Sequence, residues 1–157
     1  MALLRSIRHP LRRLAQVDRR RRALVVEAVM WLALARLALV VLPFQTLARN
    51  IGTFTPPGQG RAAGRPAPEA IVLAGEIGWA VTRAARYLPL GAVCLPQAMA
   101  ARLMLKRRGI ASVLHFGAIG GGSVYQAINA HAWLDAAGVE VTGYPLAKQC
   151  TEIACFV

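Results

Sequence analysis

The chain has 157 residues, which is enough for one domain with its own core, and 56% of them are hydrophobic. Lys and Arg outnumber Asp and Glu by 19 to 7, so the formal net charge of +12 favours acidic peptides or anionic membrane surfaces as partners. Basic and aromatic residues do not alternate as in a nucleic-acid platform, and we expect no nucleic-acid partner.

The N-terminal part predicts two helices. Residues 1–22 are rich in arginine and favour an amphipathic helix that is interrupted near Pro10. Residues 23–44 are the most hydrophobic segment and are nearly long enough to span a bilayer. Glu27 and Arg36 interrupt this segment and are too far apart to neutralise each other on a helix. We favour a buried or membrane-surface helix over a membrane span, and we expect Pro43 to end it.

A change of composition separates this part from the rest of the chain. Residues 50–68 are rich in Gly and Pro and predict a loop or linker. Residues 69–87 return to a helical pattern of apolar residues. The expected organisation is a basic, apolar helical region at 1–49, a loop at 50–68 and a core domain at 69–157.

The next helix places a thiol at its start. Cys94 precedes Pro96, which a first helical turn tolerates, and Gly109 is a natural helix stop after three basic residues. Free backbone N–H groups and the positive end of the helix dipole favour a thiolate at this position, and the thiolate is the nucleophile. The alternative is that Cys94 is a small buried hydrophobe, the commoner fate of a lone cysteine.

Strands follow this helix. Residues 110–119 predict a strand in which His115 has a structural role, and residues 120–123 predict a flexible connection. A β-hairpin is expected next, with His131, Trp133 and Asp135 on one face of its first strand. A cysteine at a helix start and a histidine on a later strand suit a thiolate–imidazole pair.

Cysteine usage bears on compartment and cofactors. The count is odd, with Cys94, Cys150 and Cys155, so we expect no disulfide framework and a reducing cytoplasm. Cys150 and Cys155 lack the companion spacing of a zinc site, and the Gly-rich run at 120–122 lacks the Lys of a P-loop. The sequence therefore predicts no metal and no cofactor.

Residues 70–143 carry a pattern that is similar to a known family, the transglutaminase-like domain of lasso-peptide biosynthesis leader peptidases, the B proteins. The matching residues, in order, are Cys94, Leu95, Arg107, Arg108, Gly109, Ile110, Leu114, Gly117, His131, Ala132 and Trp133. The resemblance implies an α+β fold in which an N-terminal helical region precedes a papain/transglutaminase-like core. In that core the catalytic helix packs on a small antiparallel sheet.

The resemblance also implies catalytic roles, with Cys94 as nucleophile and His131 as base. The family's third residue is an Asp at a position where this chain has Gly143. Simple hairpin pairing places Thr142 or Gly143 opposite His131, and Asp135 lies ~13 Å from His131 along the strand. The group that orients His131 is thus Asp135 through a bulge, Thr142, a backbone carbonyl or water. If the acid is simply lost, Gly143→Asp should preserve or improve activity.

The implied function is removal of the leader peptide from a ribosomally synthesised lasso-peptide precursor before macrocyclisation, in the bacterial cytoplasm, with membrane association confined to the inner face. The implied partners are the precursor peptide, a leader-recognition protein in trans and an ATP-dependent macrocyclase.

Two alternatives remain open. A transglutaminase-like amidase or acyltransferase would use the same Cys94 and His131, whereas a non-enzymatic membrane-associated adaptor would leave Cys94 buried.

Overall fold

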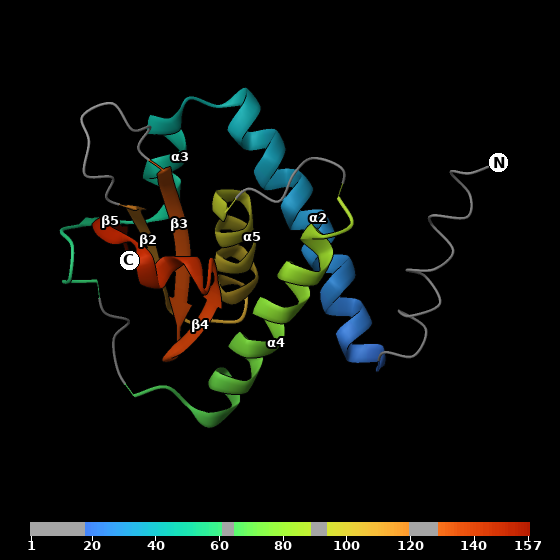
Figure 1. The fold of residues 1–157 in the computed structure, drawn as a ribbon. Helices are drawn as coiled ribbons and strands as arrows, with labels where there is room; N and C mark the ends of the chain where they lie inside the picture. Colours follow the sequence, from blue (N-terminus) through green and yellow to red (C-terminus); the bar gives the residue numbers. More distant parts are fainter. Residues whose placement is uncertain (1–17, 61–64, 89–93, 120–128) are drawn as a thin grey trace.

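The computed structural model describes residues 18–60, 65–88, 94–119 and 129–157. The first part of the predicted N-terminal helix and the predicted connection at 120–123 lie outside these ranges. Helices α2, α4 and α5 lie on one side of a five-stranded antiparallel sheet (Figure 1). This arrangement confirms the predicted α+β class with a helix packed on a small sheet.

The elements are as follows. The helices are α2 (Arg19–Val41), α3 (Phe44–Ile51), α4 (Pro68–Ala85), α5 (Cys94–Lys106) and the short 3-10 helix η1 (Leu146–Gln149). The strands are β1 (Phe54–Thr55), β2 (Ser112–Ile119), β3 (Asn129–Ala136), β4 (Val139–Thr142) and β5 (Thr151–Phe156).

Helix α5 is the centre of the core. It contacts α2 and α4 on one side and strands β2, β3 and β4 on the other. Small residues let these neighbours approach closely, and two larger side chains fill the remaining space; the fully buried positions are Ala98, Ala100, Ala101, Met104 and Leu105. Gly109 ends the helical segment with a φ of 68°, and the N–H of Ile110 bonds back to the carbonyl of Leu105. The buried helix fixes the position of Cys94, its first residue.

The sheet has the order β1-β5-β2-β3-β4, so the strand that is last in the sequence lies inside the sheet. The sequence did not predict two of its strands, β1 and β5. The expected loop at 50–68 begins within α3 and contains β1, which pairs with β5 through Phe54 and Phe156. Their rings meet edge to face, with centroids 5.9 Å apart. A two-residue strand beside Gly and Pro carries no local alternation, which is why composition alone predicted a linker.

The predicted hairpin is present, but its register differs from the expectation. Ala137 and Gly138 both have positive φ, 53° and 75°, as a two-residue type I′ turn requires. A bulge then shifts the pairing, so that Thr142 lies opposite Leu134 and β4 ends there. The expectation that Thr142 or Gly143 would lie across from His131 is therefore wrong. The turn at residues 137–138 would by itself put Tyr144 there, and the bulge shifts the pairing one residue further.

Helix α2 combines an apolar composition with a partly buried surface. Among the described residues it is the one helix long and apolar enough to cross a membrane, by length and composition alone. One stripe of α2 nevertheless joins the core with α4 and α5; its buried members are Leu24, Val25, Ala28, Leu32 and Ala35. The helix ends at Val41, just before Pro43, as predicted. The division into 1–49, 50–68 and 69–157 stays a prediction.

Candidate active site

Cys94 is the first residue of α5, as the sequence predicted. The first N–H groups of a helix have no intrahelical partner, and the dipole is positive at this end, so a negative charge on sulfur is favoured there. Cys94 is half-buried and forms no disulfide. This is the setting that a cysteine nucleophile requires, since it is held in place and still reachable.

Strand β3 approaches the sulfur directly. Strand β4 pairs with β3 only as far as Leu134, so the part of β3 before it has no β4 partner. There the N–H of Ala132 donates to Cys94 Sγ at 3.4 Å. The thiol therefore lies against the peptide group that follows His131, so the structure places Cys94 beside the backbone of the predicted base.

His131 is held by the backbone. Its Nε2 lies 2.7 Å from the carbonyl oxygen of Gly143. A carbonyl oxygen can only accept, so Nε2 must carry the hydrogen and donate it. In the neutral ring the free lone pair is then on Nδ1, which becomes the basic nitrogen. A backbone carbonyl is one of the orienting groups that the sequence left open, and it stands at the position of the family's acid.

Gly143 leaves no room for that acid. Its φ is +89°, and a Cβ at this position would lie 2.5 Å from Cβ of Trp133 and 2.8 Å from the carbonyl oxygen of Ala132. Both are nearer than nonbonded atoms approach, and the second is rigid backbone. The expectation that Gly143→Asp preserves or improves activity is corrected, because the side chain clashes with the strand that carries His131.

Asp135 contacts other groups than His131. Its Oδ1 accepts a hydrogen bond of 2.6 Å from the hydroxyl of Tyr144, and its Oδ2 lies 3.3 Å from Nε2 of His115. Burial, reinforced by Asp135, raises the pKa of Tyr144, so the hydroxyl stays protonated as a donor. Tyr144 directly follows Gly143 and thus anchors the segment whose carbonyl holds His131. Glu140 pairs with Asp135 across the hairpin.

Trp133 stacks with two imidazoles. Its ring centroid lies 6.2 Å from that of His131 and 5.3 Å from that of His115, with nearly parallel planes in both pairs. Trp133 is buried, so it restricts the rotation of His131. The alternation of residues 131, 133 and 135 on one face was the sequence signal for this stack, whereas nothing local pointed to Tyr144.

His115 occupies a strongly acidic environment. Nδ1 lies 2.6 Å from Oε1 of Glu152, and Asp135 lies near the other ring nitrogen. Burial opposes protonation of the ring, but the hydrogen bonds and charges of the two carboxylates outweigh it and raise the pKa of His115. These contacts join β2, β3 and β5, in keeping with the structural role that the sequence indicated.

Cys150 is the other half-exposed thiol, and it lies within electrostatic reach of Cys94. Burial, followed by the charge of Cys94, raises the pKa of the Cys150 thiol. Its Sγ donates to the carbonyl oxygen of Leu146 at 3.5 Å. The raised pKa disfavours the thiolate form of Cys150, which is the form that acts as a nucleophile.

Comparison with known proteins agrees with this geometry. The family model described as the transglutaminase-like superfamily matches residues 38–154. No curated protein and no solved structure matches the chain significantly. The matched range includes Cys94, His131 and Gly143, together with β1 to β4 and the first part of β5. The chain belongs to the transglutaminase-like superfamily, whose fold fits a cysteine peptidase.

Proposed function

We propose that the protein is a cysteine peptidase that removes the leader from a lasso-peptide precursor. One observation carries the proposal: the sulfur at the start of α5 accepts the N–H next to a histidine whose Nε2 is fixed on a backbone carbonyl. The backbone contact supports a pairing of the Cys94 sulfur with the His131 imidazole, and a hydrogen on Nε2 leaves Nδ1 free to act as the base. The resemblance of residues 70–143 to leader peptidases supplies the choice of substrate.

The reaction follows from these two groups. Nδ1 of His131 takes the thiol proton, and the Cys94 sulfur attacks the carbonyl carbon at the leader junction. The imidazolium then gives this proton to the departing amine as the C–N bond breaks, which leaves a thioester. Water, deprotonated by His131, attacks the thioester, the C–S bond breaks, and the sulfur recovers its proton. In this proposal the backbone N–H of Cys94 donates to the oxyanion in both steps.

A groove beside the orienting segment supports peptide binding. A cavity of about 300 Å³ lies between α4 and the 140–144 segment, and its wall includes Gly143 and Tyr144. Trp79, Arg83 and Arg86 of α4 line the opposite side. Two guanidinium groups and an indole suit an extended acidic peptide, because they offer charge complementarity and apolar contact together.

The partners and the location belong to the same proposal. The described part of the chain contains no small β-rich recognition module of its own, so we infer that a leader-recognition protein acts in trans and that an ATP-dependent macrocyclase takes the product. The net charge of +12 supports contact with the anionic inner face of the membrane from the cytoplasm.

The test is cleavage of a precursor by the full-length protein in the presence of the recognition protein. Cys94→Ala and His131→Ala should each lower turnover by at least about 10³-fold while the fold stays intact, because one removes the nucleophile and the other its base. Cys150→Ala is the matched control and should retain activity. Mass spectrometry separates hydrolysis from transfer to an amine. Cleavage by Cys94→Ala at the wild-type rate would reject the assignment.

The same assay tests recognition in trans. Omitting the recognition protein should reduce cleavage strongly, since it holds the leader near the sulfur and raises the effective concentration. Equal cleavage rates with and without the recognition protein would contradict leader recognition in trans. They would not contradict the assignment of Cys94 as nucleophile.

A further inference from the structure

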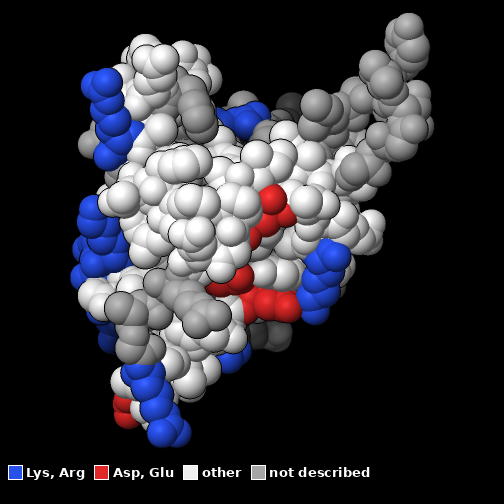
Figure 2. Space-filling view, turned by 90° about the vertical axis from the view of Figure 1, so that its left-hand side faces the viewer, with Lys and Arg blue, Asp and Glu red and all other residues white. Residues whose placement is uncertain are grey.

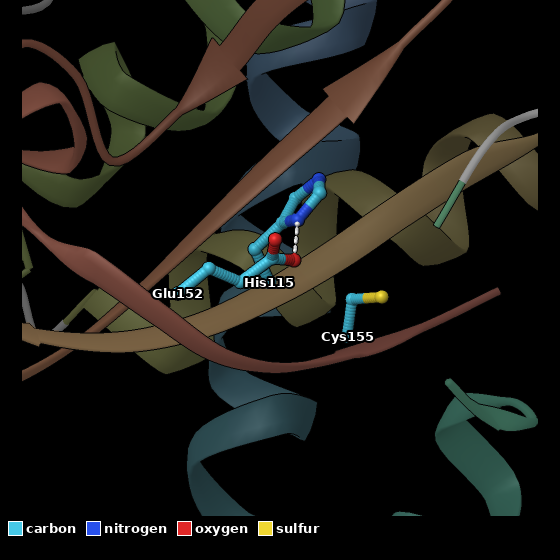
Figure 3. A group of neighbouring side chains, drawn as sticks. All are labelled: His115, Glu152 and Cys155. Carbon is cyan, nitrogen blue, oxygen red and sulfur yellow. Dashed lines mark hydrogen bonds and ion pairs between the residues drawn. The ribbon is translucent and has the colours of Figure 1, made fainter. Parts of the chain in front are cut away.

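A second cluster of reactive side chains lies on the sheet, apart from Cys94. His115 belongs to β2, and Glu152 and Cys155 belong to the neighbouring β5 (Figure 3). A ring nitrogen of His115, a carboxylate oxygen of Glu152 and Sγ of Cys155 all lie within 4.8 Å of one another. Cys155 is fully buried, and the His115 side chain is 11% exposed. The cluster is therefore sheltered and not a chance meeting of surface groups.

A β-bulge creates the convergence. Glu152 and Cys155 are three residues apart, and in a regular strand they would point to opposite faces. The pairing moves from Phe116–Ala154 to Gly117–Glu152, which leaves Ile153 without a partner on β2. The extra residue turns Glu152 to the face that holds Cys155 and His115. Bulges that re-aim a side chain are features of functional regions.

The surroundings hold the donors in place. Oδ2 of Asp135 lies 3.3 Å from Nε2 of His115, the nitrogen that points away from the cluster. A carboxylate in this position fixes the imidazole of a metal-binding histidine. The second oxygen of Glu152 accepts the N–H of Gly58 at 2.9 Å, and Cys155 Sγ lies 3.5 Å from the carbonyl oxygen of Thr55.

We propose that His115, Glu152 and Cys155 form a binding site for a zinc-type divalent cation, with Asp135 as the group that orients His115. The donors are one nitrogen, one oxygen and one sulfur, and the two softer donors select zinc over calcium or magnesium. Zinc binds such donors at about 2.0–2.3 Å. The three donor atoms lie within 4.8 Å of one another, so they need to move only a little to reach a central ion. Binding releases the protons of the thiol and of the imidazole nitrogen to solvent. Three protein ligands leave the fourth position of a tetrahedral ion to water.

Charge favours a cation here. The chain has 7 acidic residues against 19 basic ones, yet Asp135 and Glu152 both contact the one imidazole. On the face seen in Figure 2, Asp and Glu side chains gather near the middle of a mostly uncharged surface, and Lys and Arg lie towards its edges. A bound cation would link β2 to β5 and, through Gly58, to the segment after β1.

Cobalt(II) binding tests the site without any peptide substrate. The double variant Cys94→Ala, Cys150→Ser of the full-length protein keeps Cys155 as its single thiol, so a thiolate-to-cobalt charge-transfer band must come from Cys155. We expect this band, its displacement by zinc, and its loss on adding Cys155→Ser. His115→Gln and Glu152→Gln should each weaken zinc binding by at least about 10-fold, and Asp135→Asn by about 10-fold through the orientation of His115.

Glu140→Gln is the matched control. Glu140 is a carboxylate of the same sheet that pairs with Lys148 outside the cluster, and its loss should leave zinc affinity unchanged. Zinc should also raise the melting temperature of the wild type but not that of Cys155→Ser, each folded by circular dichroism. The proposal is overturned if the folded double variant shows no charge-transfer band, or if zinc stabilises Cys155→Ser as much as the wild type. Neither result bears on the peptidase assignment.

Discussion

The orienting group of His131 is a carbonyl, and this changes what residue 143 must be. A carboxylate would fix the tautomer and also add a full negative charge, whereas the Gly143 carbonyl fixes the tautomer with a dipole alone. Strand β3 passes so close that only glycine fits. The backbone around residue 143 therefore excludes the acid that the family carries at this position.

Substitution of two glycines tests whether β3 leaves room for a side chain at position 143. Gly143→Ala should lower the free energy of unfolding by about 2–4 kcal/mol, because a positive φ and a clash with Trp133 add. Gly109→Ala has a similar positive φ, +68°, but open space around its Cβ, and should cost only about 1 kcal/mol. Urea unfolding measures both. Equal losses of unfolding free energy would mean that only the positive φ matters, and that β3 moves to make room for a side chain at position 143.

The site could be predicted from the sequence where a side chain acts, but not where a backbone atom acts. Cys94 and His131 were found because their side chains act and their positions, a helix start and a strand, have local signatures. The partner of His131 was among the candidates but was not singled out. A backbone carbonyl leaves no mark in the sequence, and the turn position and a bulge changed the pairing that simple geometry predicted. Tyr144 was missed since its contact with Asp135 depends on the same bend of the chain.

At the scale of elements, an ion-pair cluster fastens α2 to the end of α5. Glu27, near the start of the hydrophobic segment at residues 23–44, bonds to Arg108 at 2.6 Å and to Arg107 at 3.1 Å. The sequence showed only that Arg36 was too distant to neutralise it. Hydrogen bonds from Arg108 hold the pKa of Glu27 below its ordinary value of 4.5, although burial opposes this.

The pH dependence of this cluster has a definite sign. Because the pKa of Glu27 is lowered by folding, its stabilisation is complete above pH 4.5 and is lost as the pH falls through the folded-state value. Glu27→Gln should reduce the unfolding free energy by about 1–2 kcal/mol at pH 7, and the difference from wild type should shrink below pH 4.5. Denaturant titrations at several pH values measure it.

A matched control uses another acid. Glu69 lies in the first turn of α4 and is exposed, so Glu69→Gln should change the unfolding free energy by less than about 0.5 kcal/mol. If the effect of Glu27→Gln were constant between pH 3 and pH 7, charge would not be its cause.

The elements themselves divide by the range of their contacts. Helices α2, α4 and α5 and the β3–β4 hairpin follow from periodicity and turn residues, which are local. Strand β5 and its partner β1 were missed because residues about a hundred positions apart pair there, and neither segment alternates clearly. Long-range pairing of short strands leaves no pattern within a single window of sequence.

On the scale of the whole molecule, α2 presents two different apolar surfaces. Its core side is closed by Leu32, 5% exposed, and its outer side carries Leu37, 59% exposed. An exposed apolar helix face beside a run of arginines suits the surface of an anionic membrane. We expect the full-length protein to bind vesicles that contain anionic lipid, to bind neutral ones weakly, and to release the anionic vesicles as salt rises.

Paired substitutions separate the two faces. Leu37→Ser should weaken vesicle binding with little loss of stability, whereas Leu32→Ala should lower the unfolding free energy by about 2–4 kcal/mol. Vesicle co-sedimentation and urea unfolding report the two effects. Undiminished vesicle binding by Leu37→Ser would exclude this face from membrane contact.

The position of β5 has a consequence for biosynthesis. The ribosome makes β5 after every other described element, yet this strand lies between β1 and β2. Until it emerges, β1 and β2 are unpaired edges of a nascent chain, which invite pairing with other chains. Glu152, the partner of His115, arrives with the same strand. Closure of the sheet and completion of the acidic cluster are therefore a single event that follows the synthesis of every other described element.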